Sequence, residues 1–171
     1  MQLTGHHAVS RQWISGAMPA NTRAASYDLT VGSVVIDGTE YKTDIPKVKP
    51  QQIVVLVSKE TVMVPPGHVA YAMPKTSLCM EGIHTLNTGI VDPGWCGKLS
   101  SVAINFERSD YQVTQGAAFL RLAFHQLDDP SASGPETGRD DQSYLATLRA
   151  QSRSFPSTFM DIPGHLERAT D

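Results

Sequence analysis

The residues of this chain that are best suited to chemistry lie between Pro74 and Phe106. Lys75, Thr76 and Ser77 place one cation and two hydroxyls side by side, where an alternating segment gives way to a turn. Hydroxyls and backbone N–H groups donate hydrogen bonds and lysine supplies charge, so this triplet predicts a cradle for phosphate oxygens. Asp92 ends an apolar run before a Pro-Gly turn. An acid at one strand end and a cradle at another predict a site assembled from adjacent strands.

Short strands must position these residues. Alternating or apolar segments recur at intervals of about 8–12 residues, a spacing typical of an all-β barrel or sandwich. Asp37-Gly38 predicts a hairpin between 34–36 and 40–42. A further strand opens at Ala25 and ends at Gly32. The other expected strands are 53–58, 61–64, 68–73, 98–106 and 117–125.

Two short helices are expected at the ends of the chain. In residues 3–16, Thr4 serves as the cap, Val9, Trp13 and Ile14 give an apolar face, and Gly16 ends the helix. A second helix is expected at residues 142–153, after a stretch rich in Pro, Ser, Gly and acids.

Composition limits the classes of partner. The chain has 171 residues, 40% of them hydrophobic and 18% charged, which fits one globular domain. The net charge of −3 argues against a nucleic-acid groove, which needs a basic excess. It does not argue against a nucleotide, because a few local cations and Mg²⁺ can neutralise a triphosphate.

Other features predict a cytoplasmic protein with no membrane partner. No run of residues approaches the roughly 18 apolar positions of a membrane span. The first residues lack the basic and then apolar pattern of a signal peptide. Cys79 and Cys96 are too few for a disulfide framework.

Three motifs resemble those of the dCTP deaminase and dUTPase superfamily, in the family order. Residues 75–78 match a phosphate motif that reads Arg-Ser-Ser-Leu, with conservative changes. Residues 89–97 closely match Gly-x-Ile-Asp-Pro-Gly-Trp-x-Gly. Residues 25–29 read Ala-Ser-Tyr-Asp-Leu, which is the family's first motif. The resemblance covers about residues 1–126.

The resemblance implies a domain plan and an assembly. Residues 1–127 are expected to form a distorted, dUTPase-like β-barrel of the β-clip type, with short helices at both ends. Residues 128–141 are expected to form a flexible linker. Residues 142–171 form a tail that either closes over the site as a lid or packs on the barrel or a neighbouring subunit. The family implies a homotrimer with sites between subunits, acting on a pyrimidine deoxynucleotide triphosphate.

The resemblance also implies residue roles. Asp92 would position the attacking water, and Lys75, Thr76 and Ser77 would hold phosphates. Arg121 stands where the family carries a Gln, and it either binds phosphate or is an ordinary surface residue. Mg²⁺ would be held through the phosphates, with no direct protein ligand.

Further residues complete the predicted site. Asp28 would support it through water near the metal, or is a strand-end acid that bonds backbone N–H groups. Trp95 stands where dUTPases carry a Tyr under the sugar, although a core role is as compatible. Ser100 is expected to contact substrate, and the tail offers Tyr144 and Gln151.

Two family chemistries compete. Deamination of dCTP needs a Glu ten residues after the motif Asp, where this chain has Val102, and Met80 replaces a phosphate-motif Arg. Glu107 would need a shifted strand register to substitute. The sequence therefore favours Mg-dependent hydrolysis of dUTP, or a related dNTP, to the monophosphate and pyrophosphate. The alternatives are a dCTP deaminase with altered acid/base residues, an inactive nucleotide-binding or regulatory homologue, and a purely structural trimer.

Overall fold

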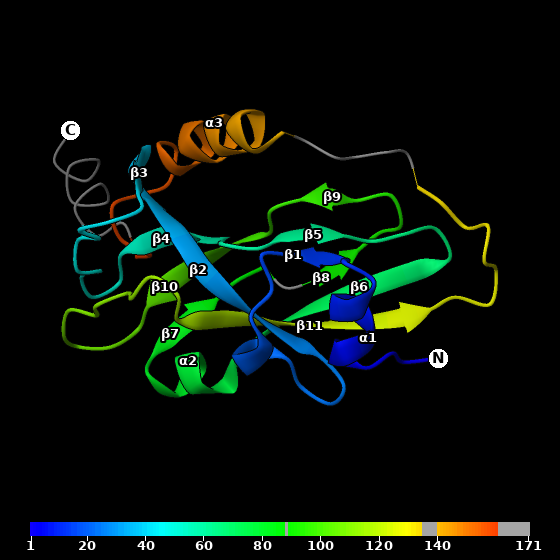
Figure 1. Ribbon diagram of the computed structural model, residues 1–171. Helices are drawn as coiled ribbons and strands as arrows, with labels where there is room; N and C mark the ends of the chain where they lie inside the picture. Colours follow the sequence, from blue (N-terminus) through cyan, green and yellow to red (C-terminus); the bar gives the residue numbers. More distant parts are fainter. Residues whose placement is uncertain (88, 135–139, 161–171) are drawn as a thin grey trace, which may run out of the picture.

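The computed structural model describes residues 1–87, 89–134 and 140–160 and is built mainly from β-strands (Figure 1). The strands are β1 (Ile14–Ser15), β2 (Tyr27–Ile36), β3 (Thr39–Tyr41), β4 (Ile53–Ser58), β5 (Thr61–Met63), β6 (His68–Pro74), β7 (Ile83–Thr85), β8 (Gly89–Val91), β9 (Cys96–Gly97), β10 (Ser100–Asn105) and β11 (Ala118–Gln126). The helices are α1 (Gly5–Ser10), α2 (Thr76–Met80) and α3 (Asp141–Ser152), with one 3₁₀ turn, η1 (Pro19–Asn21).

One curled sheet forms the body of the domain. Its strand order is β7-β10-β4-β2-β11-β6-β8, with β3 paired to β2 and every pairing antiparallel. A smaller sheet has the order β1-β5-β9. The strands carry many apolar side chains and curl around one core. This core includes Tyr27, Leu29, Phe119 and Leu122, all fully buried. The prediction of an all-β, dUTPase-like barrel with short helices is confirmed.

Strand β2 is longer than the sequence indicates. The sequence predicts an end at Gly32, but the strand continues to Ile36 and pairs first with β11 and then with β4. The register with β4 shifts between Val31 and Ser33, so Gly32 sits in a β-bulge. A side chain there would collide with the backbone of Lys59. The glycine therefore marks a close backbone approach within a strand and not its end.

The N-terminal helix is shorter than predicted. The Thr4 cap is confirmed, since its hydroxyl accepts a hydrogen bond from the His7 backbone N–H at 3.1 Å. The helix ends at Ser10, and Gln12 then takes a positive φ of 59°. Ile14 pairs with Val62 in the small sheet. Trp13 and Ile14 are buried, but Trp13 lies in the turn after the helix and Ile14 lies in β1. Gly16 therefore does not end the helix.

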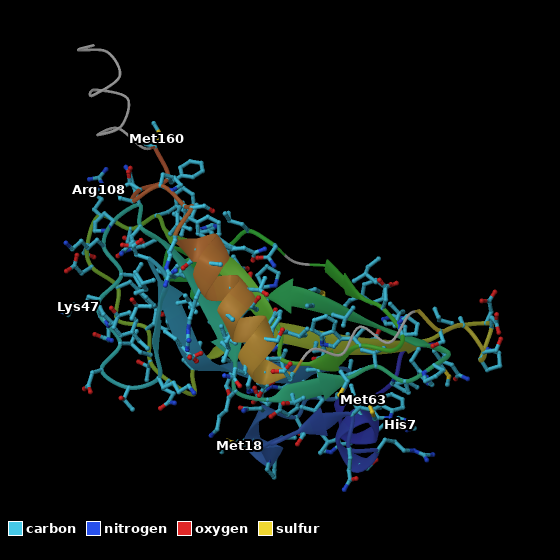
Figure 2. The ribbon with its side chains drawn as sticks, turned by 90° about the horizontal axis from the view of Figure 1, so that it is seen from above. His7, Met18, Lys47, Met63, Arg108 and Met160 are labelled. Carbon is cyan, nitrogen blue, oxygen red and sulfur yellow. The ribbon has the colours of Figure 1, made fainter. Side chains whose placement is uncertain are left out.

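The C-terminal helix forms close to its predicted bounds and packs on the sheet of its own chain. Leu148 of α3 is buried against Val35, Val55 and Val57 of β2 and β4. In Figure 1, α3 and α2 lie on opposite sides of the strands. Figure 2 shows α3 lying across the sheet, with Lys47 and Arg108 at the end away from His7 and Met63.

Part of the predicted linker contacts the barrel. Backbone N–H groups join Leu127 to Gly67, Gly67 to Ala132 and Gly134 to Pro93, with distances of 2.8–3.1 Å. Residues 135–139 of the linker and 161–171 of the tail lie outside the described residues. Among the helices that the structure describes, none is long and apolar enough to cross a membrane.

Candidate functional site

A buried carboxylate gathers three cations from distant parts of the chain. Asp28 lies on β2 with its side chain fully buried. Its Oδ2 accepts hydrogen bonds from Arg23 Nε and Lys75 Nζ, both at 2.9 Å, and its Oδ1 accepts one from Arg121 Nε at 2.9 Å. We call Asp28, Arg23, Lys75 and Arg121 the cation cluster. Strand pairing brings Arg121 directly opposite Asp28, and β6 delivers Lys75 at its end.

The cation cluster carries an excess of positive charge. Burial would raise the pKa of the Asp28 carboxyl, but hydrogen bonds from Arg121, Lys75 and Arg23 outweigh burial and lower its pKa to about 2. Asp28 is therefore ionised near neutral pH and cancels only one of three positive charges. The Arg23 and Arg121 side chains are 48% and 41% exposed. Their remaining N–H groups are available to an anion.

Two hydroxyls lie beside the cation cluster. Thr76 and Ser77 follow Lys75 in the first turn of α2, and both residues are exposed. Among the described residues, neither hydroxyl makes a hydrogen bond to the protein. The Lys75 backbone N–H donates to the Phe119 carbonyl at 3.1 Å, which fixes the start of the turn against β11. The structure thus brings together Lys75, Thr76, Ser77, Arg121 and Asp28.

Arg23 is the member of the cluster that sequence reasoning missed. It lies in the loop between η1 and β2, five positions before Asp28. Its signal was an isolated cation just ahead of the first family motif. The Asp28 carboxylate bonds to side chains of three separate segments, which differs from both the water-mediated role and the backbone-bonding role expected for it.

Asp92 lies in a turn that is held firmly on both sides. The Gly94 N–H donates to the Val64 carbonyl at 2.8 Å, and the Gly134 N–H donates to the Pro93 carbonyl at 3.1 Å. The Asp92 side chain is exposed, and within the described residues it makes no hydrogen bond. It is therefore free to accept a hydrogen bond from water or a ligand.

A single chain does not bring Asp92 to the cation cluster. Val91, just before Asp92, pairs with Ala70, whereas Lys75 follows the last residue of β6. About five residues of strand separate the two positions, which is roughly 17 Å at about 3.4 Å per residue. Within one chain, Asp92 therefore lies apart from the cation cluster, and its place in a shared site stays a prediction.

Three other predicted residues form a separate group near the Asp92 turn. Ser100 Oγ and the Tyr144 hydroxyl are 2.7 Å apart, and the Trp95 and Tyr144 rings meet edge to face at 6.0 Å. Trp95 is half-buried and lines a pocket of about 430 Å³ together with Met63, Pro66, Gly94, Cys96 and others. Gln151 lies exposed in the last turn of α3. None of these four residues lies in the cation cluster.

Strand β10 presents no acid at the position of the deaminase Glu. Val102 is half-buried and packs with the apolar cluster under α3. The register of β10 on β4 is unbroken from Ser100 to Ile104. Glu107 follows the strand, and its side chain packs beside Gly82, between α2 and β7. No register shift places Glu107 beside Val102.

The cation cluster offers no free carboxylate oxygen to a magnesium ion. No group of three or more His, Cys, Asp or Glu side chains in that part of the chain comes together as metal ligands. Both oxygens of Asp28 are already engaged by cations. Like charges repel, so a second cation is disfavoured beside the cation cluster.

Comparisons with known proteins agree with this fold and these motifs. A family model described as dCTP deaminase-like matches residues 46–127. A dCTP deaminase of Pyrococcus horikoshii is 30% identical over 113 residues, which cover 62% of this chain and 70% of the relative. A Frog virus 3 protein, whose name is "Putative deoxyuridine 5′-triphosphate nucleotidohydrolase", is 26% identical over 141 residues, which cover 78% of this chain and 77% of the relative.

A solved structure supports the fold. The 2′-deoxycytidine 5′-triphosphate deaminase of Agrobacterium tumefaciens superposes with a TM-score of 0.61 at 15% identity. The match covers 73% of this chain and 48% of the deaminase chain, so this chain spans about half of that protein. With the matched relatives, the curled sheet and the motifs at 25–29, 75–78 and 89–97, the chain belongs to the dCTP deaminase/dUTPase superfamily.

Proposed function

We propose that this protein hydrolyses dUTP, or a related pyrimidine deoxynucleotide triphosphate, to the monophosphate and pyrophosphate. The cation cluster is the observation that carries the proposal. Three cations around one buried carboxylate leave two positive charges beside two exposed hydroxyls. A chain of phosphates matches such a surface in charge and in its demand for N–H and O–H donors. The names of the relatives support a nucleotide substrate.

In the proposed reaction, Lys75, Arg121 and the hydroxyls of Thr76 and Ser77 hold the phosphates. Water attacks the α-phosphorus, the bond to the bridging oxygen breaks, and pyrophosphate leaves with that oxygen. Asp92 accepts a hydrogen bond from the attacking water and orients it. The fixed cations face the negative charge that moves onto the leaving group. Magnesium would arrive with the triphosphate and neutralise part of its charge.

The separation of Asp92 from the cation cluster supports a site shared between copies of the chain. Beside Arg121, the outer face of β6 and β8 exposes Tyr71, Met73 and Ile90 to 37%, 42% and 62%. Met73 pairs with Arg121 across the sheet, so the apolar face adjoins the cluster. A neighbouring copy on this face could bring its own Asp92 to the phosphates. A homotrimer is the closed assembly that the family resemblance implies.

Deamination of dCTP is the second candidate, favoured by the match to a dCTP deaminase-like family model. It needs a group that moves protons between water, ring and leaving ammonia. The apolar surroundings of Val102 and the distant position of Glu107 supply none beside β10. Hydrolysis therefore fits the described residues better. A nucleotide-binding protein without chemistry would share the cluster and show no product.

Two inactive variants test the shared site. Lys75→Gln removes a phosphate-binding cation, and Asp92→Asn removes the water-orienting carboxylate, so each alone should lose pyrophosphate release from dUTP. If the variants are denatured together and refolded as mixed trimers, about a quarter of the sites should contain both intact residues. Activity near that fraction supports a site built from two copies. No recovery, from mixtures that form trimers, would place both residues in one chain's site or outside the mechanism.

A further inference from the structure

The loop that carries Arg23 is held in one conformation by its surroundings. The Arg23 N–H donates to the Ser26 carbonyl at 2.8 Å, and Thr22 bridges to Tyr27. Gly5 of α1 packs against this loop so closely that a side chain there would collide with the carbonyl oxygens of Arg23 and Ser26. The backbone of Arg23 is therefore fixed before any ligand arrives, which lowers the entropy lost on binding.

The guanidinium of Arg23 is only partly used by the protein. Its Nε donates to Asp28 Oδ2 at 2.9 Å, and this is the only hydrogen bond that the side chain makes within the described residues. The side chain is 48% exposed, although the carboxylate it touches is fully buried. Asp28 thus orients the guanidinium, while the terminal nitrogens keep donors for an outside acceptor.

Charge in the cluster exceeds what its carboxylate requires. Lys75 and Arg121 already more than neutralise Asp28, and both bond to it at 2.9 Å. The hydrogen bond of Arg23 to Asp28 is therefore opposed by the repulsion between Arg23 and its two like-charged neighbours. That repulsion is relieved when a polyanion binds. The position of Arg23 is therefore best explained by a ligand with several negative charges.

We infer that Arg23 is a phosphate-binding residue that sets the preference of this site for the triphosphate over the monophosphate. The inference rests on the proposed function and deepens it. Lys75, Thr76 and Ser77 reach the site from the β6–α2 junction, and Arg23 reaches it from the loop before β2. Arg23 and Lys75 bond the same oxygen of Asp28, so the third cation adds its charge directly beside the other two. A triphosphate brings more negative charge and more acceptor oxygens to this cluster than a monophosphate does, so it gains more from Arg23. Charge-assisted hydrogen bonds of arginine place the expected gain at about 10- to 100-fold in affinity.

Calorimetric titration with a non-hydrolysable α,β-imido analogue of dUTP, and with dUMP, tests the inference. Arg23→Gln should weaken binding of the analogue about 10- to 100-fold and leave dUMP affinity within about threefold. Arg23→Lys keeps the charge and loses the two-pronged guanidinium, so its affinity for the analogue should lie between those of Arg23→Gln and the wild type. It also provides a test if the Arg23→Gln protein does not fold. Arg108→Gln is the matched control, since Arg108 lies away from Met18, which precedes this loop (Figure 2).

The outcomes separate the inference from the function on which it rests. A loss of affinity for the analogue, with dUMP affinity kept, supports Arg23 as a phosphate ligand. Unchanged binding, or equal weakening of both nucleotides as expected if Arg23 only positions Asp28, overturns the inference and leaves the proposed function standing. If the wild-type protein binds neither nucleotide, the proposed function fails and the inference fails with it.

Discussion

Arg121 and Asp28 face each other across the β11–β2 pair and join through a two-point contact. Arg121 Nε is 2.9 Å from Oδ1, and its terminal nitrogen Nη2 is 3.4 Å from Oδ2. The contact raises the pKa of the Arg121 guanidinium through its hydrogen bond to Asp28. Antiparallel pairing thus places Arg121 and Asp28 opposite each other on neighbouring strands. Lys75 and Arg23 donate further hydrogen bonds to the same carboxylate.

Replacing Asp28 by Asn should destabilise the fold in a pH-dependent way. The folded-state pKa of about 2 lies below the ordinary value of 3.8, so ionised Asp28 stabilises the folded state. This contribution is fully present above about pH 4 and is lost as the pH falls through 2. From the shift we expect roughly 2 kcal/mol at pH 7.

Urea unfolding of the wild type and Asp28→Asn between pH 7 and pH 2 measures that loss. The difference in free energy of unfolding should shrink toward the acid end. Asp110→Asn, at an exposed position, should show no comparable difference at any pH. A wild-type advantage that stays constant down to pH 2 would contradict a stabilising ionised Asp28.

Replacing Asp92 by Asn should abolish turnover and spare binding. The amide is nearly isosteric but orients water poorly, so a loss of about 10²- to 10⁴-fold in kcat is expected. Affinity for the α,β-imido analogue should stay within a few-fold of wild type. Asp110→Asn should retain normal turnover. Turnover that survives in Asp92→Asn would remove Asp92 from the mechanism.

Truncating Leu148 should detach α3 from the sheet. Leu148 is 8% exposed and packs on Val35, Val55 and Val57. Leu148→Ala should cost about 2–5 kcal/mol in the free energy of unfolding, or release the helix alone. Hydrogen exchange of α3 amides distinguishes the two results. Leu86→Ala, at a residue 55% exposed, should cost less than about 0.5 kcal/mol. Equal effects of the two variants would argue that α3 is not docked by Leu148.

The bond between Tyr144 and Ser100 should couple α3 to β10. The two oxygens are 2.7 Å apart. A double-mutant cycle of Tyr144→Phe and Ser100→Ala should give a coupling of about 0.5–1.5 kcal/mol in urea unfolding. A coupling near zero would mean that the hydroxyls do not hold the helix in solution.

The sequence predicts the strands better than it predicts their partners. Asp37-Gly38 was correctly read as a hairpin, since Ile36 pairs with Thr39, because the signal is local. The prediction of a strand end at Gly32 is wrong because a strand end and a bulge look alike in one sequence, and only the approach of Lys59 distinguishes them. The sequence places Trp13 and Ile14 on a helical face, but Ile14 pairs with Val62 in a strand. This long-range contact is not visible in the local sequence.

The site was predictable only where motifs carry it. Lys75, Thr76 and Ser77 follow from the family pattern, whereas Arg121 stands where that pattern has a Gln. The structure places Arg121 and Lys75 on one carboxylate, with Thr76 and Ser77 next in the chain. Arg23 belongs to no motif, and its contact with Asp28 depends on how the loop after η1 folds back on α1. The separation of Asp92 from Lys75 depends on the register of β8 on β6, which nothing local specifies. The roles of Trp95, Ser100, Tyr144 and Gln151 stay predictions.

The most direct test is one incubation each with dUTP and dCTP in the presence of Mg²⁺, resolving all nucleotide products and assaying pyrophosphate and ammonia. The proposed function predicts dUMP and pyrophosphate in equal amounts from dUTP, with no ammonia from dCTP. Ammonia from dCTP would contradict it and would mean that a residue other than one at position 102 moves the proton. If nucleotide binds and neither product forms, the chain is a nucleotide-binding protein and the hydrolase proposal is wrong.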